Sequence, residues 1–115
     1  MAPHIRSGVV ASFVAAVALL AYSVGHGAAA AKPARHTVTM EAVRFQPDVT
    51  EAKRGDSIVW VNKDPFPHTV TSQSGKFDSH QIQPGESWSY KVEKSGDIQY
   101  TCSLHPTMKA TLRVK

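Results

Sequence analysis

The 115-residue sequence predicts an all-β fold, a two-sheet β-sandwich of short strands that follows a cleavable signal peptide. Three observations lead to this prediction. Apolar and polar residues alternate in short runs from residue 36 onward, turn-forming residues separate these runs at regular intervals, and no helical period appears after the N-terminal segment. Short strands with this spacing are typical of sandwiches rather than of helical or α/β domains.

The N-terminal segment has the three parts of a secretory signal peptide. A positively charged start contains Arg6, an uncharged apolar run follows over residues 9–24, and small residues occupy positions 28–31. We therefore expect a signal peptide over residues 1–31, cut among its last alanines, and a periplasmic or secreted protein. An uncleaved membrane anchor is the alternative, since the run is close to the lower length limit of a spanning helix.

Cleavage leaves 84 of the 115 residues and lowers the net charge from +4 to +3, because Arg6 is the only Lys, Arg, Asp or Glu that is lost. We expect a short linker over residues 32–35 and a single monomeric domain over residues 36–115. The positive charges are scattered, so nucleic-acid binding is not expected. Stable membrane insertion is not expected either once the signal peptide is cleaved. The only cysteine, Cys102, cannot form an intrachain disulfide, and ligation to a metal would explain an unpaired thiol in an exported protein.

Residues 36–43 form the first predicted strand. Apolar side chains alternate there and place Val38, Met40 and Ala42 on one face of the strand. Residues 45–47, which end in a proline, are expected to break it.

The later strands are recognised by the same alternation and by the turns between them. They are predicted over residues 49–52, 57–62, 68–72, 86–93, 98–102 and 108–114. Within this set, residues 57–62 form a continuous apolar run, which is typical of a strand covered on both sides. Gly, Pro, Asp and Asn supply the expected turns and loops at residues 53–56, 63–67, 73–80, 84–85 and 94–97.

The last strand, loop and strand carry three soft or borderline metal ligands. Cys102, His105 and Met108 follow one another at intervals of three residues. Alternation over residues 98–102 and 108–114 turns the cysteine and the methionine toward the same interior, with the histidine on the loop between them. A thiolate, an imidazole and a thioether together suit copper better than zinc, calcium or magnesium.

A blue-copper centre requires a second histidine from elsewhere in the chain. His68 is the strongest candidate, because it follows the rigid segment 65–67 and opens a predicted strand. His80 has polar neighbours that favour a solvated residue, and His36 lies at the start of the mature chain. Both remain weaker alternatives.

Three segments together resemble a known family. Residues 56–62, 67–68 and 96–108 are similar to the plastocyanin/azurin group of cupredoxins, the type 1 blue copper proteins. Within that group they are most similar to the amicyanins, whose ligand loop also keeps two residues between Cys and His and two between His and Met. The resemblance covers nearly the whole mature chain, from residue 36 to residue 115.

The resemblance implies a Greek-key sandwich and one type 1 copper ion. The implied ligands are His68, Cys102, His105 and Met108. The sequence departs from the family pattern at Thr69, where many relatives have an asparagine that ties the two ligand loops together by hydrogen bonds. This departure affects the hydrogen bonds around the ligands and the reduction potential, and leaves the ligand set unchanged.

Four protein ligands leave no position for a substrate or an activated water, so we do not expect an enzyme. An enzyme with Cys102 as nucleophile and His105 as base lacks an orienting third group. We expect a soluble one-electron carrier that cycles copper between Cu(I) and Cu(II) for periplasmic redox partners, such as a dehydrogenase or a c-type cytochrome. The resemblance suggests that these partners dock near His105, inside an apolar patch of Pro65, Phe66, Pro67, Leu104 and Pro106. The alternative is a copper storage or delivery protein with the same ligands.

Overall fold

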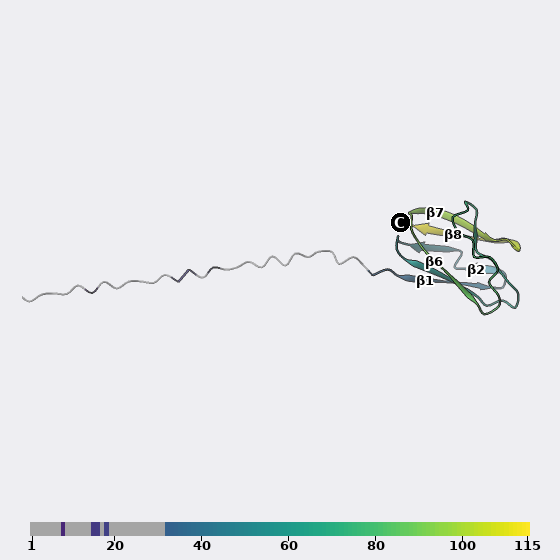
Figure 1. Ribbon diagram of the computed structural model, residues 1–115, viewed down its shortest axis with the longest axis horizontal. Helices are drawn as coiled ribbons and strands as arrows, with labels where there is room; N and C mark the ends of the chain where they lie inside the picture. The colour runs from purple at the N-terminus through teal and green to yellow at the C-terminus, as the bar shows by residue number, and fades with distance from the viewer. Residues whose placement is uncertain (1–7, 9–14, 17, 19–31) are drawn as a thin grey trace, which may run out of the picture. The chain divides into compact units, whose positions relative to one another are not determined.

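The computed structural model describes residues 8, 15–16, 18 and 32–115 (Figure 1). The signal peptide predicted over residues 1–31, and the membrane anchor that is its alternative, therefore lie almost entirely outside the described residues. Among the residues that the structure does describe, none forms a helix with the length and apolar character needed to cross a bilayer.

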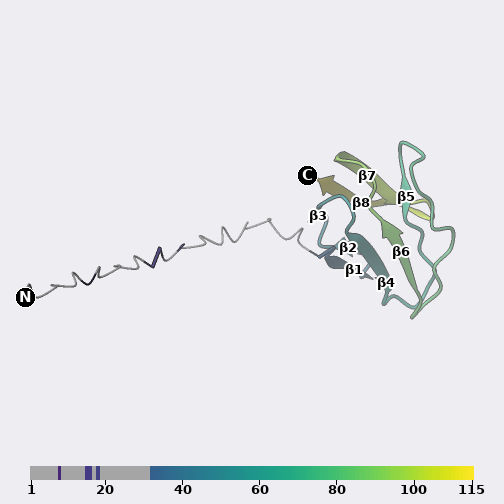
Figure 2. The ribbon, with the colours of Figure 1, turned by 60° about the vertical axis from the view of Figure 1, so that its left-hand side comes forward.

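The described domain is a sandwich of two four-stranded sheets. Its eight strands are β1 (Arg35–Glu41), β2 (Arg44–Gln46), β3 (Val49–Ala52), β4 (Ser57–Asn62), β5 (Thr71–Ser72), β6 (Ser87–Lys91), β7 (Gly96–Cys102) and β8 (His105–Val114). One sheet has the order β2-β1-β4-β6 and the other has the order β3-β8-β7-β5. Figures 1 and 2 show the two layers, with β7 and β8 in one and β1, β4 and β6 in the other. The all-β sandwich predicted from the sequence is therefore present.

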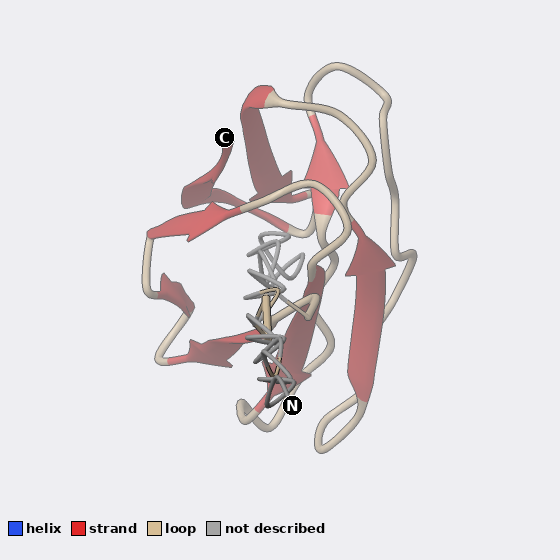
Figure 3. Cartoon of the chain, turned by 90° about the vertical axis from the view of Figure 1, so that its left-hand side faces the viewer, coloured by secondary structure: helices blue, strands red, loops and turns tan. Residues whose placement is uncertain are grey.

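Strand pairing is antiparallel except at two places. β1 runs parallel to β4, with Arg35 opposite Ser57, and β3 runs parallel to β8, with Val49 opposite Thr111. Turns and irregular loops connect the strands (Figure 3). β4 is an inner strand between β1 and β6, and four of its six residues are buried, Ile58, Val59, Trp60 and Asn62.

A cluster of aromatic rings fills the space between the sheets. Trp60 of β4 is completely buried, and its ring lies 5.5 Å from Trp88, 5.5 Å from Tyr100 and 5.9 Å from Phe77, measured between ring centroids. Aromatic side chains carry large apolar areas, and their pairs add to the stabilisation that burial alone gives. The rings therefore join β4 and β6 of one sheet to β7 of the other.

The first predicted strand ends differently from the prediction. Residues 45–47 are predicted to end the first strand without forming one of their own, whereas β2 folds back on β1 as a hairpin with Met40 opposite Phe45. Ala42 and Val43 form the turn with positive φ angles of 54° and 56°, so Ala42 is exposed instead of continuing the buried face. Phe45 is buried, and its burial against the core supports a strand of only three residues.

Two other strands start three residues away from their predicted positions, whereas the remaining boundaries differ by at most two residues. Only Thr71 and Ser72 of the segment 68–72 form a strand, while His68 makes an isolated backbone bridge to Ile82. β8 begins at His105 rather than at Met108, so the histidine of the ligand loop is already held by strand pairing.

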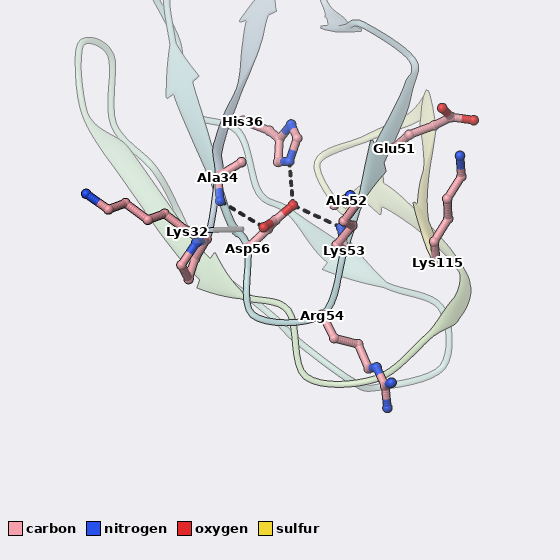
Figure 4. Close-up of a pocket in the computed structure, with 10 residues that line it drawn as sticks. Lys32, Ala34, His36, Glu51, Ala52, Lys53, Arg54, Asp56 and Lys115 are labelled. Atoms are coloured by element: carbon pink, nitrogen blue, oxygen red, sulfur yellow. Dashed lines mark hydrogen bonds and ion pairs between the residues drawn. The ribbon is translucent and has the colours of Figure 1, made fainter. Parts of the chain in front are cut away.

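One end of the sandwich is organised by a buried carboxylate. Asp56, just before β4, accepts hydrogen bonds from the backbone N–H groups of Ala34 and Lys53 and contacts His36 Nε2 at 2.9 Å (Figure 4). The hydrogen bond with His36, followed by those from the two backbone groups, lowers the pKa of Asp56 from 3.8 to about 2. The carboxylate therefore ties the start of β1 and the turn after β3 to the start of β4.

This pKa predicts a pH dependence of stability. A carboxyl group whose pKa is lower in the folded state stabilises the fold above its unfolded pKa and loses that contribution as the pH falls through the folded value. We expect the free energy of unfolding of the metal-free wild type to exceed that of Asp56→Asn at pH 6, and the difference to shrink between about pH 4 and pH 2. Urea unfolding at several pH values measures this difference. An equal difference at pH 6 and at pH 2 would contradict the assignment.

Candidate metal centre

Three of the predicted ligands converge at the end of the sandwich opposite Asp56. Ligand atoms of His68, Cys102 and His105 all lie within 4.8 Å of one another. Cys102 Sγ is 3.7 Å from His68 Nδ1 and 3.6 Å from His105 Nδ1. A metal bound at about 2.0–2.3 Å to each atom, with trigonal angles, would separate sulfur and nitrogen by about 3.7 Å. The two nitrogen–sulfur distances therefore fit a trigonal site without rearrangement.

Strand pairing holds the cysteine and one histidine in place. Cys102 ends β7, His105 begins β8, and the two residues are paired across the hairpin with a shift of register between Thr101 and Cys102. Residues directly opposite each other on adjoining strands present their side chains to the same face, so this pairing brings the thiol and the imidazole together.

The second histidine comes from a loop that is fixed at both ends. His68 donates its backbone N–H to Ile82 and accepts the N–H of Ile82 in return, at N···O distances of 3.1 and 2.7 Å. Asn62 supports the preceding loop, because its side-chain amide donates to the carbonyl groups of Phe66 and Ile82. His68 is thus completely buried and placed by backbone hydrogen bonds that do not depend on a metal.

Met108, the fourth predicted ligand, lies on β8 and is 1% exposed. It follows His105 by three residues, and its neighbours Ala110 and Leu112 continue the buried row of the strand. A buried thioether together with one thiolate and two imidazoles is the donor set typical of a type 1 copper site. The chemistry of the residues therefore fits copper.

Thr69 connects the two ligand loops. Its backbone N–H donates to Cys102 Sγ at 3.2 Å, and its hydroxyl oxygen accepts the backbone N–H of Ser103 at 2.8 Å. The same hydroxyl lies 3.0 Å from the hydroxyl groups of Ser103 and Thr71. Thr69 thus supplies a hydrogen-bond donor to the sulfur and a hydrogen bond between the two ligand loops. The connection that an asparagine makes in many relatives is therefore made by threonine in this chain.

We expect Thr69→Val to destabilise the metal-free domain by about 1 kcal/mol, because the substitution keeps the shape and leaves the Ser103 N–H without its acceptor. Thr50→Val is a matched control, since the Thr50 hydroxyl is buried without a hydrogen-bond partner in the described part of the chain. The control should be neutral or stabilising in urea unfolding. Equal losses for the two variants would contradict a role of the Thr69 hydroxyl.

Asp64, which contacts the candidate ligand His68, was not predicted from the sequence. Asp64 is 6% exposed, and its Oδ2 lies 2.7 Å from His68 Nε2, the ring nitrogen that faces away from Cys102. Burial raises the pKa of the Asp64 carboxyl, but hydrogen bonds from His68 and from the N–H groups of Val43 and Ala42 outweigh it, and the pKa falls below 3.8. An aspartate four residues before a candidate ligand was the only signal of this contact in the sequence.

The two alternative histidines lie outside the cluster. His80 is exposed and has a positive φ of 56°, and His36 is paired with Asp56 at the start of β1. Neither belongs to the group of ligand atoms formed by His68, Cys102 and His105. The geometry favours His68 over both, as the sequence had indicated.

His105 and its surroundings differ from His68 in their exposure. His105 is half-buried whereas His68 is 0% exposed, and the ring of Phe66 packs against both, with centroid distances of 5.4 and 5.2 Å. Phe66 and Leu104 are themselves 36% and 44% exposed. The histidine of the ligand loop is therefore the one that reaches the surface, and apolar side chains are exposed in the loops that carry the site.

Comparison with known proteins gives a family match over most of the chain. The family model of the cupredoxin-like domain matches residues 12–114. The chain is 28% identical over 83 residues to amicyanin-alpha of Methylorubrum extorquens, which covers 68% of this chain and 70% of that protein. It is 29% identical over 87 residues to plastocyanin of Scenedesmus fuscus, covering 64% of this chain and 89% of that protein.

Solved structures show the same architecture. A mutant of amicyanin in its Cu(I) form superimposes with a TM-score of 0.67 at 20% identity, covering 70% of this chain and 82% of that one. A Cu-containing nitrite reductase from Thermus scotoductus matches with a TM-score of 0.66 at 29% identity, covering 70% of this chain and 22% of that one. The likeness to amicyanin at this identity concerns the fold alone.

Proposed function

The chain belongs to the cupredoxin-like domain family, and we propose that it is a one-electron carrier with a single type 1 copper ion. His68, Cys102, His105 and Met108 would hold the metal. The observation that supports this most is the placement of one sulfur and two imidazole nitrogens at separations of 3.6 and 3.7 Å, which suit trigonal coordination. A bound copper ion would supply one-electron exchange between Cu(I) and Cu(II).

The protein's part in this function is to keep the donor atoms fixed. His68 is held by two backbone hydrogen bonds to Ile82, and Cys102 is held by strand pairing and by the N–H of Thr69. A site whose donors do not move between the two oxidation states requires little rearrangement for each transfer. The hydrogen bond to the Cys102 sulfur and the thioether of Met108 would both affect the reduction potential.

The arrangement favours a carrier over a catalyst. Four protein ligands would fill the coordination of a bound copper ion and would leave no open position for a substrate or an activated water. The named relatives include amicyanins and plastocyanins, and we infer from this kinship that the chain has no enzymatic activity of its own.

We place the protein in the periplasm or outside the cell, in accordance with the signal peptide expected over residues 1–31. Its partners would be redox proteins, such as a dehydrogenase or a c-type cytochrome, that dock where His105 reaches the surface. The exposed side chains of Phe66 and Leu104 suit a small apolar contact of the kind that short-lived electron-transfer complexes use. The half-buried His105 ring would be the route for the electron.

A cycling experiment with the copper-loaded domain tests this proposal against storage or delivery. We expect ascorbate to reduce the protein, ferricyanide to reoxidise it, and the copper content to stay constant over repeated cycles in the presence of a Cu(I) chelator. Transfer of Cu(I) to the chelator during the first reduction would instead support a delivery protein and would contradict the carrier.

A further inference from the structure

Asp64 lies on the side of the His68 ring that faces away from Cys102, and its carboxylate accepts three hydrogen bonds. Its Oδ1 accepts the backbone N–H of Ala42 at 2.7 Å, and its Oδ2 accepts the N–H of Val43 at 2.9 Å. The third donor is His68 Nε2, at 2.7 Å from Oδ2. The backbone of Asp64 is fixed as well, because its own N–H donates to the side-chain oxygen of Asn62. The carboxylate is therefore buried and cannot turn away from the histidine.

The turn between β1 and β2 contributes to this arrangement. Ala42 and Val43 both have positive φ angles, which are uncommon for residues other than glycine and unfavourable for a β-branched side chain. In this conformation the two N–H groups point at one carboxylate. The strained turn is thus compensated by Asp64 and in return keeps Asp64 against His68.

The contact determines which nitrogen of His68 is free to bind a metal. An ionised carboxylate can only accept hydrogen bonds, so His68 Nε2 must carry a proton. In the neutral ring this leaves the lone pair on Nδ1, the atom that lies 3.7 Å from Cys102 Sγ. Partners of this kind fix the tautomer of a ligating histidine and make it a stronger donor.

We propose that Asp64 is a positioning residue of the metal centre that selects the Nδ1-binding form of His68 and stabilises Cu(II) relative to Cu(I). This inference rests on the proposed function. A fixed negative charge beyond the ring favours the more positive oxidation state, because the site is buried and screening by water is weak. Asp64 therefore lowers the reduction potential of the centre.

Asp64→Asn tests this proposal, because the substitution keeps the shape of the side chain and removes its negative charge. We expect the affinity for Cu(II) to fall by about 10–100-fold, as is typical when the hydrogen-bond partner of a ligand is replaced. The affinity for Cu(I) should fall less, so the reduction potential should rise. Pulsed electron paramagnetic resonance should also show a changed coupling of the remote nitrogen of one histidine. An unchanged potential and an unchanged coupling would overturn the proposal.

Asp56→Asn is a control with nearly the same local structure. Asp56 also accepts two backbone N–H groups and contacts a histidine Nε2, at 2.9 Å, but it precedes β4 whereas Asp64 follows it. A loss of folding stability without a change of potential is expected for this variant. Equal shifts of potential in the two variants would show that the effect of Asp64 is only structural and would overturn the proposal.

Wild-type spectra keep the proposal testable if Asp64→Asn does not fold. In the described part of the chain, His68 Nε2 contacts a carboxylate whereas no hydrogen bond is found for His105 Nε2. The two remote nitrogens should therefore give unequal couplings, and equal couplings would overturn the role of Asp64. A wild type without a type 1 spectrum contradicts the proposed function itself, which separates the two failures.

Discussion

Replacement of Cys102 by serine is expected to abolish the intense visible absorption of the copper-loaded protein. The colour of a blue-copper centre depends on a thiolate bound to Cu(II), and a serine hydroxyl neither ionises at neutral pH nor offers a soft donor. Because Cys102 is a ligand, the affinity for Cu(II) should fall by more than the roughly 10–100-fold that loss of a ligand's hydrogen-bond partner costs. Visible spectra recorded during titration with Cu(II) measure both effects.

His80→Ala is the control for this prediction. His80 is exposed and does not belong to the cluster of His68, Cys102 and His105, so the variant should keep the wild-type spectrum. Loss of the blue colour in His80→Ala together with an unchanged colour in Cys102→Ser would contradict the ligand assignment.

Trp60→Ala is expected to have the largest effect on folding. The ring is 0% exposed and packs against Phe77, Trp88 and Tyr100, so its removal leaves a cavity between the sheets. Substitutions of this kind cost about 3–5 kcal/mol, and small domains have only about 5–15 kcal/mol of stability in total. Urea unfolding of the metal-free protein measures the loss, because a bound metal would add its own stabilisation.

Val49→Ala provides the comparison for an apolar residue outside the core. Val49 lies on β3 and is 41% exposed, and substitutions at such positions usually change stability by less than about 0.5 kcal/mol. If Trp60→Ala proved as mild as Val49→Ala, the aromatic cluster would not be the main source of stability.

Much of the fold follows from local patterns in the sequence. The alternation in β7 and β8 and the continuous run of β4 determine which side chains are buried, so these strands could be predicted from short windows. The placement of Cys102 and His105 is local too, because only two residues lie between them and the hairpin pairs them directly.

The features that could not be predicted depend on residues far apart in the chain. β2 has only three residues and is stabilised by the burial of Phe45, which no local pattern reveals. The turn at Ala42 and Val43 lacks the Gly or Asn that usually marks positive φ angles, and its amides are satisfied by Asp64 more than twenty residues later. The contact of Asp64 with His68 depends on the same convergence.

The sequence departure at Thr69 illustrates a third case. The residue type alone did not indicate whether the two ligand loops are tied together. The structure supplies the tie through the Thr69 hydroxyl and the N–H of Ser103, two groups that are thirty-four residues apart. Threonine can thus connect the loops in place of asparagine, because the two loops lie close enough for its short hydroxyl group to reach Ser103.

The central claim is that the chain holds one copper ion in a type 1 centre, and a single measurement tests it most directly. Visible and electron paramagnetic resonance spectra of the purified domain should be recorded after addition of one equivalent of Cu(II). The grouping of His68, Cys102 and His105, together with the buried thioether of Met108, predicts an intense blue band with narrow copper hyperfine splitting. A pale solution with the wide splitting of ordinary Cu(II), despite stoichiometric binding, would contradict the claim.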